Sequence, residues 1–93
     1  MATLERIKDG KGDNGSRSEA IKWKEDGTID KVVSRYPTVG CSMLVGSLSA
    51  RSYSDKDYWL TTEVVEILEE REMEDGQKYF KFKTENSIYE YWG

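Results

Sequence analysis

The stretch YFKFKTENSIYEYWG, residues 79–93, ends the chain and decides the fold. Seven of its fifteen residues are apolar or aromatic, and a charged or polar residue separates most of them. Such alternation is typical of β-strands, because successive side chains of a strand point to opposite faces. Glu85 and Asn86 lie between the two alternating runs and suit a two-residue turn, since asparagine tolerates the left-handed conformation. The sequence therefore predicts a hairpin.

The turn fixes which residues of this hairpin face each other. With Glu85-Asn86 as the turn, Phe82 faces Tyr89 and Phe80 faces Tyr91 on one face of the sheet. Aromatic pairs of this kind contribute roughly 0.5–1.5 kcal/mol beyond the area that they bury. We therefore expect these four rings to fill the core. The remaining expected pairs are Thr84 with Ser87, Lys83 with Ile88, Lys81 with Glu90, and Tyr79 with Trp92.

The preceding segment, TTEVVEILEEREMEDG at residues 61–76, suits either a strand or a helix. Its β-branched residues favour a strand, whereas its glutamates and Leu68 favour a helix. A three-residue loop at Glu74-Asp75-Gly76 favours the strand, because it pairs opposite charges and apolar residues across a second hairpin. The pairs that it predicts are Met73 with Gln77, Glu72 with Lys78, Glu69 with Lys81, and Leu68 with Phe82.

A third hairpin is predicted in SEAIKWKEDGTIDKVVSRY, residues 18–36, because an Asp-Gly pair separates two alternating runs. With Gly27 in the left-handed conformation, the predicted pairs are Lys24 with Thr28, Trp23 with Ile29, and Lys22 with Asp30. Two further strands are expected in residues 41–53, where Gly46 marks a bulge, and in residues 58–62.

These elements predict an all-β fold of five to six strands. Both faces of the C-terminal sheet carry apolar residues, so we expect a small SH3-like or OB-like barrel or a strongly bent antiparallel meander. Residues 9–18 contain three glycines and no hydrophobic residue, which is typical of a loop. We expect residues 1–18 to form a flexible N-terminal arm with a glycine-rich loop, and residues 19–93 to form a single all-β domain.

The stretches DYWLTTEVVEI (57–67) and FKFKTENSIYEYW (80–92) carry a resemblance as well as a fold signal. They resemble small proteins of phages and other mobile elements that show W-x-T-T-x-V-x-x-I and then F-K-T-x-N-S-x-Y. The resemblance covers roughly the last forty residues, and hairpin chemistry alone also explains its motif. It implies a viral accessory protein, but no activity and no site residue carries over from it.

Charge and composition narrow the classes of function. The net charge is −4, with nine basic and seven acidic residues in 1–54 but five basic and eleven acidic residues in 55–93. This balance disfavours nucleic-acid binding, which usually shows a basic footprint. Cys41 is the only cysteine, so no disulfide forms within the chain and a reducing compartment is expected. We expect a cytoplasmic protein, since no signal peptide or apolar run of membrane-spanning length is present.

No catalytic, cofactor or metal site is predicted. The chain lacks histidine, which removes the commonest general base and metal ligand. Residues 10–15 match G-x-G-x-x-G, but a βαβ unit around them is not expected, and the acidic residues near them fail the EF-hand spacing. The acidic run in residues 63–75 is interpreted as a charged strand that suits a sheet edge, where charge resists aggregation. Cys41 is expected to be a buried small hydrophobe.

Two groups of residues are candidates for binding. Aromatic residues and arginine are favoured anchors of binding patches, and they cluster around the polar turn SDKD at residues 54–57. The alternative for Tyr58 and Trp59 is a place in the core. The second group is the acidic strand, which suits a basic partner. The predicted binding residues are Arg51, Tyr53, Tyr58, Trp59, Glu69, Glu70 and Glu72.

The hypothesis is a non-enzymatic viral or mobile-element accessory protein that binds an unidentified protein, for example to inhibit a host or defence protein. Self-association into a homo-oligomer through edge strands is a further expectation. The alternative is a small barrel that binds single-stranded nucleic acid or a nucleotide by stacking bases on its aromatic residues. The basic residues that this alternative would use are Lys22, Lys24, Lys31 and Arg35.

Overall fold

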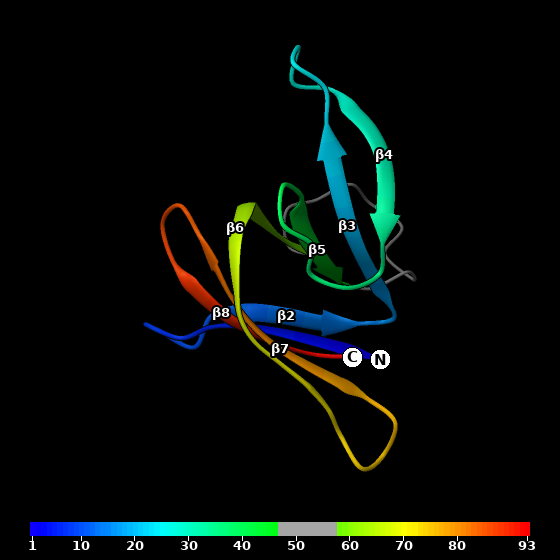
Figure 1. The fold of residues 1–93 in the computed structure, drawn as a ribbon, viewed down its shortest axis with the longest axis vertical. Coiled ribbons are helices and arrows are strands. Elements are labelled where there is room, and N and C mark those ends of the chain that lie inside the picture. Colours follow the sequence, from blue (N-terminus) through cyan, green and yellow to red (C-terminus); the bar gives the residue numbers. More distant parts are fainter. Residues whose placement is uncertain (47–57) are drawn as a thin grey trace.

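A computed structural model describes residues 1–46 and 58–93, which form one antiparallel sheet and contain no helix (Figure 1). The strand order across the sheet is β2-β1-β8-β7-β6-β5-β3-β4. The strands are β1 (Ala2–Arg6), β2 (Gly12–Gly15), β3 (Arg17–Trp23), β4 (Ile29–Ser34), β5 (Ser42–Gly46), β6 (Tyr58–Glu72), β7 (Lys78–Thr84) and β8 (Ile88–Trp92).

The all-β prediction is confirmed, but the predicted strand count of five to six was too low. Eight strands are present in the described residues, because the N-terminus adds two strands beside β8. Within those residues the sheet is not closed into a barrel, since no ladder joins β2 to β5 or to β4. Its two halves run in different directions in Figure 1. Cα atoms of β2 nevertheless come within 8 Å of Cα atoms of β5 and β6.

The C-terminal hairpin has the predicted register. Phe82 pairs with Tyr89, Phe80 with Tyr91, and the pairs on the other face also match. The backbone N–H of Thr84 donates to the carbonyl oxygen of Ser87 at 2.8 Å, which closes the hairpin at the expected turn. β7 and β8 lie in the middle of the sheet, with β6 on one side and β1 on the other.

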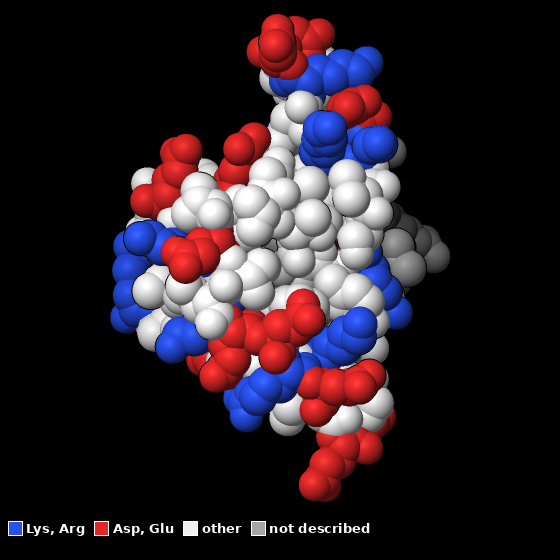
Figure 2. Space-filling view, in the orientation of Figure 1, with Lys and Arg blue, Asp and Glu red and all other residues white. Residues whose placement is uncertain are grey.

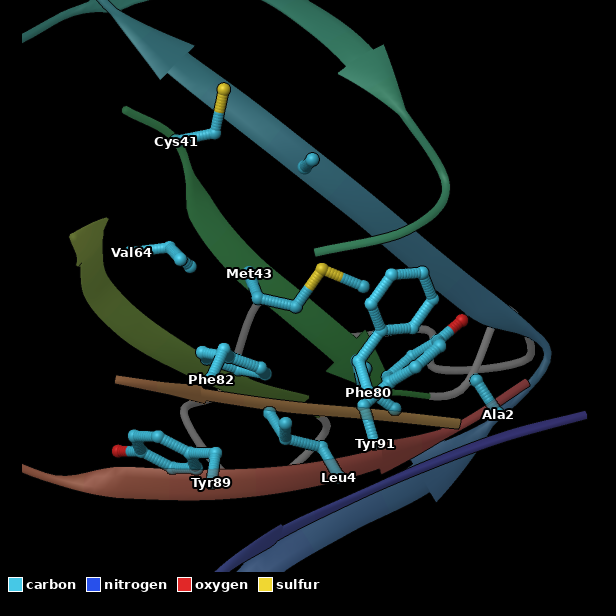
Figure 3. Close-up of a cluster of buried hydrophobic side chains, with 11 residues drawn as sticks. Ala2, Leu4, Cys41, Met43, Val64, Phe80, Phe82, Tyr89 and Tyr91 are labelled. Atoms are coloured by element: carbon cyan, nitrogen blue, oxygen red, sulfur yellow. The ribbon is translucent and has the colours of Figure 1, made fainter. Parts of the chain in front are cut away.

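The four aromatic side chains of this hairpin lie in the core, as predicted (Figure 3). The rings of Phe82 and Tyr89 stack at 5.4 Å between centroids, and those of Phe80 and Tyr91 meet edge to face at 6.0 Å. These separations are typical of attractive aromatic pairs. Smaller side chains from other parts of the chain complete the cluster: Ala2, Leu4, Ala20, Cys41, Met43, Val45 and Val64.

The hydroxyl group of Tyr91 connects the part of the sheet that contains β8 with the part that contains β3 and β4. Tyr91 OH donates to the carbonyl oxygen of Arg35 at 3.2 Å and shares a hydrogen bond of 2.7 Å with Ser18 Oγ. Arg35 follows β4 and Ser18 is the second residue of β3, whereas Tyr91 belongs to β8. Tyr36 packs beside this junction, with its ring 5.7 Å from that of Phe80. The bend of the sheet is therefore held by side-chain contacts as well as by ladders.

The second hairpin forms as a strand pair, as predicted, and the helix alternative for residues 63–72 is wrong. Glu72 pairs with Lys78 and Glu69 with Lys81, but Leu68 does not pair with Phe82. Ile67 takes that position, because a bulge adds Leu68 to β6 as an extra residue. Leu68 is consequently 41% exposed rather than part of the core.

The first hairpin has the predicted pairs at its turn, but its register differs from the prediction farther along the strands. Trp23 pairs with Ile29, and Lys24 N–H donates to Thr28 O at 2.8 Å, as predicted. Gly27 has a φ of 87°, the left-handed conformation that the turn requires. Lys22, however, faces Lys31 instead of Asp30, because a register shift adds one residue to β4 between these pairs.

The N-terminal segment lies in the sheet, whereas the sequence interpretation placed residues 1–18 in an arm outside the domain. β1 pairs with β8 and β2 pairs with β1, and Ala2 and Leu4 are buried in the core. Gly12 allows β2 to approach β1 closely, since a Cβ atom at this position would collide with the Leu4 carbonyl oxygen. The glycine-rich segment is therefore partly a strand.

Candidate protein-binding edge

β6 is long enough to pair with different strands along its two halves. Residues 58–63 pair with β5, and residues 64–72 pair with β7 on the opposite side. Beyond Val64, β6 has no strand on the side away from β7 among the described residues. The acidic half of β6, which was predicted to be a charged strand at an edge, therefore presents an open edge locally.

The backbone hydrogen bonds of Val64 and Met73, at the two ends of the acidic half of β6, show which peptide groups face this open side. Val64 faces away from β7, because its N–H donates to Cys41 O at 2.8 Å and its carbonyl oxygen accepts from Gly40 N–H at 2.9 Å. Met73 faces β7, since its N–H donates to Gln77 O at 2.7 Å. In an antiparallel pair the two orientations alternate, and a bulge puts two residues in one position.

Counting residues from Val64 to Met73 shows which peptide groups point to the open side. The peptide groups of Ile67, Glu70 and Glu72 point away from β7. Lys78, the partner of Glu72, supports this alternation, because its peptide groups exchange hydrogen bonds with Gly93 on the side away from β6. We refer to residues 66–72 as the β6 edge. Its outward N–H and C=O groups form a template for a further strand.

The side chains of Glu70 and Glu72 share one face of the β6 edge. Glu70 pairs with the buried Phe80 and Glu72 with Lys78, so both carboxylates lie on the face that carries the core. Lys78 Nζ lies 4.8 Å from the centroid of the Tyr36 ring, which holds the ammonium by a cation–π contact. A hollow beside the edge is lined by Glu70, Arg71, Glu72 and Lys78.

Glu69 and Arg71 occupy the opposite face and pair with each other. Arg71 Nε lies 3.2 Å from Glu69 Oε2, and the guanidinium stacks 4.6 Å from the centroid of the Tyr79 ring. Tyr79 OH donates to Glu90 at 2.6 Å. Burial and this hydrogen bond raise the pKa of Tyr79 to about 12. Glu69 is therefore engaged within the chain, whereas Glu70 and Glu72 border the open side.

Charge is concentrated near this edge. Residues 66–75 contain six acidic residues and one basic residue, a net charge of −5. Figure 2 shows acidic side chains at the lower tip of the molecule, where the β6–β7 hairpin lies in Figure 1. A concentrated charge of one sign attracts partners of the opposite sign. β7 contributes three lysines opposite this stretch, so the β6 edge combines open backbone groups with a moderate local excess of acidic side chains.

The other predicted binding patch is only partly visible. Arg51 and Tyr53 lie outside the described residues, and Tyr58 and Trp59 are half-buried at the start of β6. Trp59 packs against the core, and its Nε1–H donates to Tyr89 OH at 3.3 Å. The guanidinium of Arg6 covers the ring at 5.0 Å from its centroid. These contacts give Trp59 a place in the fold.

The basic residues considered for nucleic-acid binding lie around the first hairpin. Lys22 and Lys31 face each other directly across β3 and β4. Lys24 follows at the turn, while Arg35 lies beyond β4 with its guanidinium 5.5 Å from the Tyr36 ring centroid. Cys41 is buried, as predicted, and burial raises the pKa of its thiol.

The sequence predicted the glutamates of the β6 edge as binding residues, but it did not show which of them have peptide groups that point to the open side. The phase was readable from the turn at Glu74-Asp75-Gly76, since the turn fixes Met73 against Gln77. The two bulges at Val65 and Leu68 leave no clear signal in the sequence, and neither does the point at which β5 stops pairing. Lys78 was predicted opposite Glu72, whereas Tyr36 was not predicted as a neighbour of this site.

The described residues contain no group of three or more Cys, Asp or Glu side chains arranged to hold a metal ion. Among the same residues there is no helix with the length and apolar character needed to cross a membrane. Comparison of the chain with protein-family models, with curated proteins and with solved structures found no match.

Proposed function

We propose that this protein is a non-enzymatic interaction protein that binds another protein through the β6 edge. The observation that carries the proposal is the row of outward peptide groups at Ile67, Glu70 and Glu72, which have no strand partner in the described part of the chain. An open edge of this kind accepts an extended segment by strand addition, in which main-chain hydrogen bonds supply affinity.

The proposal extends to the setting in which the protein acts. The resemblance of residues 57–67 and 80–92 to phage and mobile-element proteins supports an accessory role in a host cytoplasm. The lone Cys41 is compatible with a reducing compartment. Occupying a surface of a host or defence protein would inhibit that protein without any chemical step.

A proline substitution tests the edge without disturbing the β6–β7 ladder. Proline has no N–H, and the N–H of Glu70 faces away from β7, so Glu70→Pro removes one hydrogen-bond donor from the edge only. Glu70→Ala is the matched control, since it removes the same carboxylate and keeps the N–H. Both variants and the wild type are used to capture proteins from host lysate, and the captured proteins are quantified by mass spectrometry.

The proposal predicts at least one protein that the wild type and Glu70→Ala retain and Glu70→Pro loses. Circular dichroism and thermal unfolding establish that Glu70→Pro is folded. Identical captured sets for all three folded proteins would contradict binding through the β6 edge.

A second candidate function, single-stranded nucleic-acid binding, has one specific observation in its favour. Lys22 and Lys31 lie directly opposite each other, an arrangement that destabilises a sheet unless an anion compensates it. Retention on single-stranded DNA at low salt, reduced in Lys22→Ala with Lys31→Ala and abolished by added salt, would support this function. No retention at low salt would contradict it.

A further inference from the structure

We infer that the β6 edge selects a basic extended segment, with lysine or arginine at two positions separated by one residue, opposite Glu70 and Glu72. The inference rests on the proposed function and names the chemistry of the partner. It follows from the spacing of the outward peptide groups, from the side of the sheet that each carboxylate occupies, and from the charge of the edge.

The backbone fixes the spacing. Residues 69–73 pair with β7 without a bulge, so Glu70 and Glu72 keep the regular two-residue repeat of a strand. An added strand that bonds to both places two of its own residues opposite them, also two positions apart. Side chains at such positions point to the same face. A segment with basic residues at alternate positions therefore directs both cations toward the two carboxylates.

The local environment leaves room for this pairing on one face only. Glu69 and Arg71, on the other face, already form a contact of 3.2 Å, and Arg71 also covers Tyr79. Lys78 is held over the Tyr36 ring on the core face, and it lines a hollow together with the two glutamates and Arg71. The residue between the two cations of the partner would face Arg71, which disfavours a third cation there.

A second copy of this chain is a poor occupant of residues 69–72 of the same edge. Two identical antiparallel strands pair about a two-fold axis that passes through one residue and its own copy. An axis at Glu69, Glu70 or Glu72 sets each glutamate against itself. An axis at Arg71 sets arginine against arginine and Glu70 against Glu72, and an axis at Met73 sets Glu72 against Glu74. Each arrangement places like charges opposite, which is destabilising.

The edge strand β4 is less suitable for strand addition. It has two register shifts against β3 within its six residues, so its outward peptide groups lack a regular spacing. Bulges are one means by which edge strands avoid pairing with other chains. Its charged residues, Asp30 and Lys31, are also balanced, so they select no partner by charge.

Two labelled peptides test the inference by fluorescence anisotropy at low and physiological salt. Both have about eight residues, a typical strand length, and contain two lysines among valines and threonines. In one peptide the lysines are separated by one residue, and in the other they are adjacent. Net charge and composition are identical, so a difference in affinity reports the alternation of a strand. We expect the first peptide to bind about tenfold more tightly, because only it brings both cations to one face.

The variants separate local charge from net charge. Glu70→Lys with Glu72→Lys is expected to weaken binding of the first peptide by about tenfold or more, because two attractive pairs become repulsive. Glu25→Lys with Glu85→Lys changes the net charge equally at two exposed turns and is expected to change affinity by less than about threefold at physiological salt. Glu70→Pro is expected to weaken binding as well, and Glu70→Ala by less. Circular dichroism and thermal unfolding first establish that each variant is folded.

Equal affinity for the two peptides, or equal loss in the two charge variants, would overturn the inference, since either result means unspecific attraction. The outcomes also separate the two proposals. If lysate capture depends on the Glu70 N–H and neither peptide binds, the proposed function stands and the basic partner is wrong. If the first peptide binds selectively and no captured protein depends on Glu70, the edge has the stated preference and the proposed function fails.

Discussion

Phe82 shows how much of the fold depends on single side chains. It is fully buried, it stacks on Tyr89, and its strand lies in the middle of the sheet. A chain of this size has a small core, so each large buried ring supplies a sizeable share of the free energy of unfolding. The sequence identified Phe82 and its aromatic neighbours correctly, because alternation and one turn were sufficient to place them.

Replacing the Phe82 ring tests how much it contributes to the free energy of unfolding. Phe82→Ala is expected to lower the free energy of unfolding by about 3–5 kcal/mol, through lost burial and the cavity left behind. Lys83→Ala is the control, because Lys83 is exposed on the next position of β7 and should change stability by less than about 0.5 kcal/mol. Urea denaturation measures both. A similar small loss in the two variants would mean that Phe82 is not central to the core.

Gly12 is a residue whose identity is set by close backbone approach. Gly12→Ala is expected to destabilise the protein by about 1–3 kcal/mol, because the added methyl group collides with the Leu4 carbonyl oxygen and must push β2 away from β1. Lys11→Ala, at the exposed neighbouring position, should have little effect. Thermal unfolding compares them. Equal stability of Gly12→Ala and the wild type would contradict the pairing of β1 with β2.

Tyr79 is expected to make stability depend on pH under alkaline conditions. Burial and the hydrogen bond to Glu90 raise its pKa from 10.0 to about 12. Between these values the unfolded chain loses the proton while the folded chain keeps it, so the free energy of unfolding falls as the pH rises. Tyr79→Phe removes this part of the fall. Denaturant titrations across that range measure it, and identical slopes for the two proteins would contradict the assignment.

Among the elements, β6 determines both how the two parts of the sheet are joined and where the candidate binding edge lies. Its first half joins β5 and its second half joins β7, so a single strand connects both parts of the bent sheet and leaves one edge that no described strand covers. The sequence predicted the strand, its turn and two of its charge pairs. The bulge at Leu68 was not predictable, because an extra residue costs no apolar contact when Ile67 can occupy the same position opposite Phe82.

The two neighbouring residues distinguish the registers. Ile67 is half-buried and packs against the core, whereas Leu68 is exposed. Ile67→Ala should therefore cost about 1–3 kcal/mol, less than a fully buried site, and Leu68→Ala less than about 0.5 kcal/mol. Denaturant unfolding gives both values. The reverse order would restore the register in which Leu68 faces Phe82.

At the scale of the whole molecule, the long-range pairings were what the sequence could not supply. Each hairpin is local, so turn chemistry and alternation were enough to predict its strands and the pairs beside its turn, although not the bulges farther away. The pairing of β1 with β8 joins residues at opposite ends of the chain, and its polar neighbour β2 resembles a loop in composition. The candidate edge has the same origin, since it exists only because β5 pairs with one half of β6 and no described strand covers the other.

Amide hydrogen exchange, followed residue by residue by NMR, tests the central claim that the aromatic C-terminus is the interior of the sheet. Amides of β7 and β8 should exchange most slowly, because both strands are paired on both sides and surround the core. Amides of Glu70 and Glu72, which face the open side, should exchange fast while that of Arg71 is protected. Exchange of Phe80, Phe82, Tyr89 and Tyr91 as fast as that of Glu70 would contradict the account.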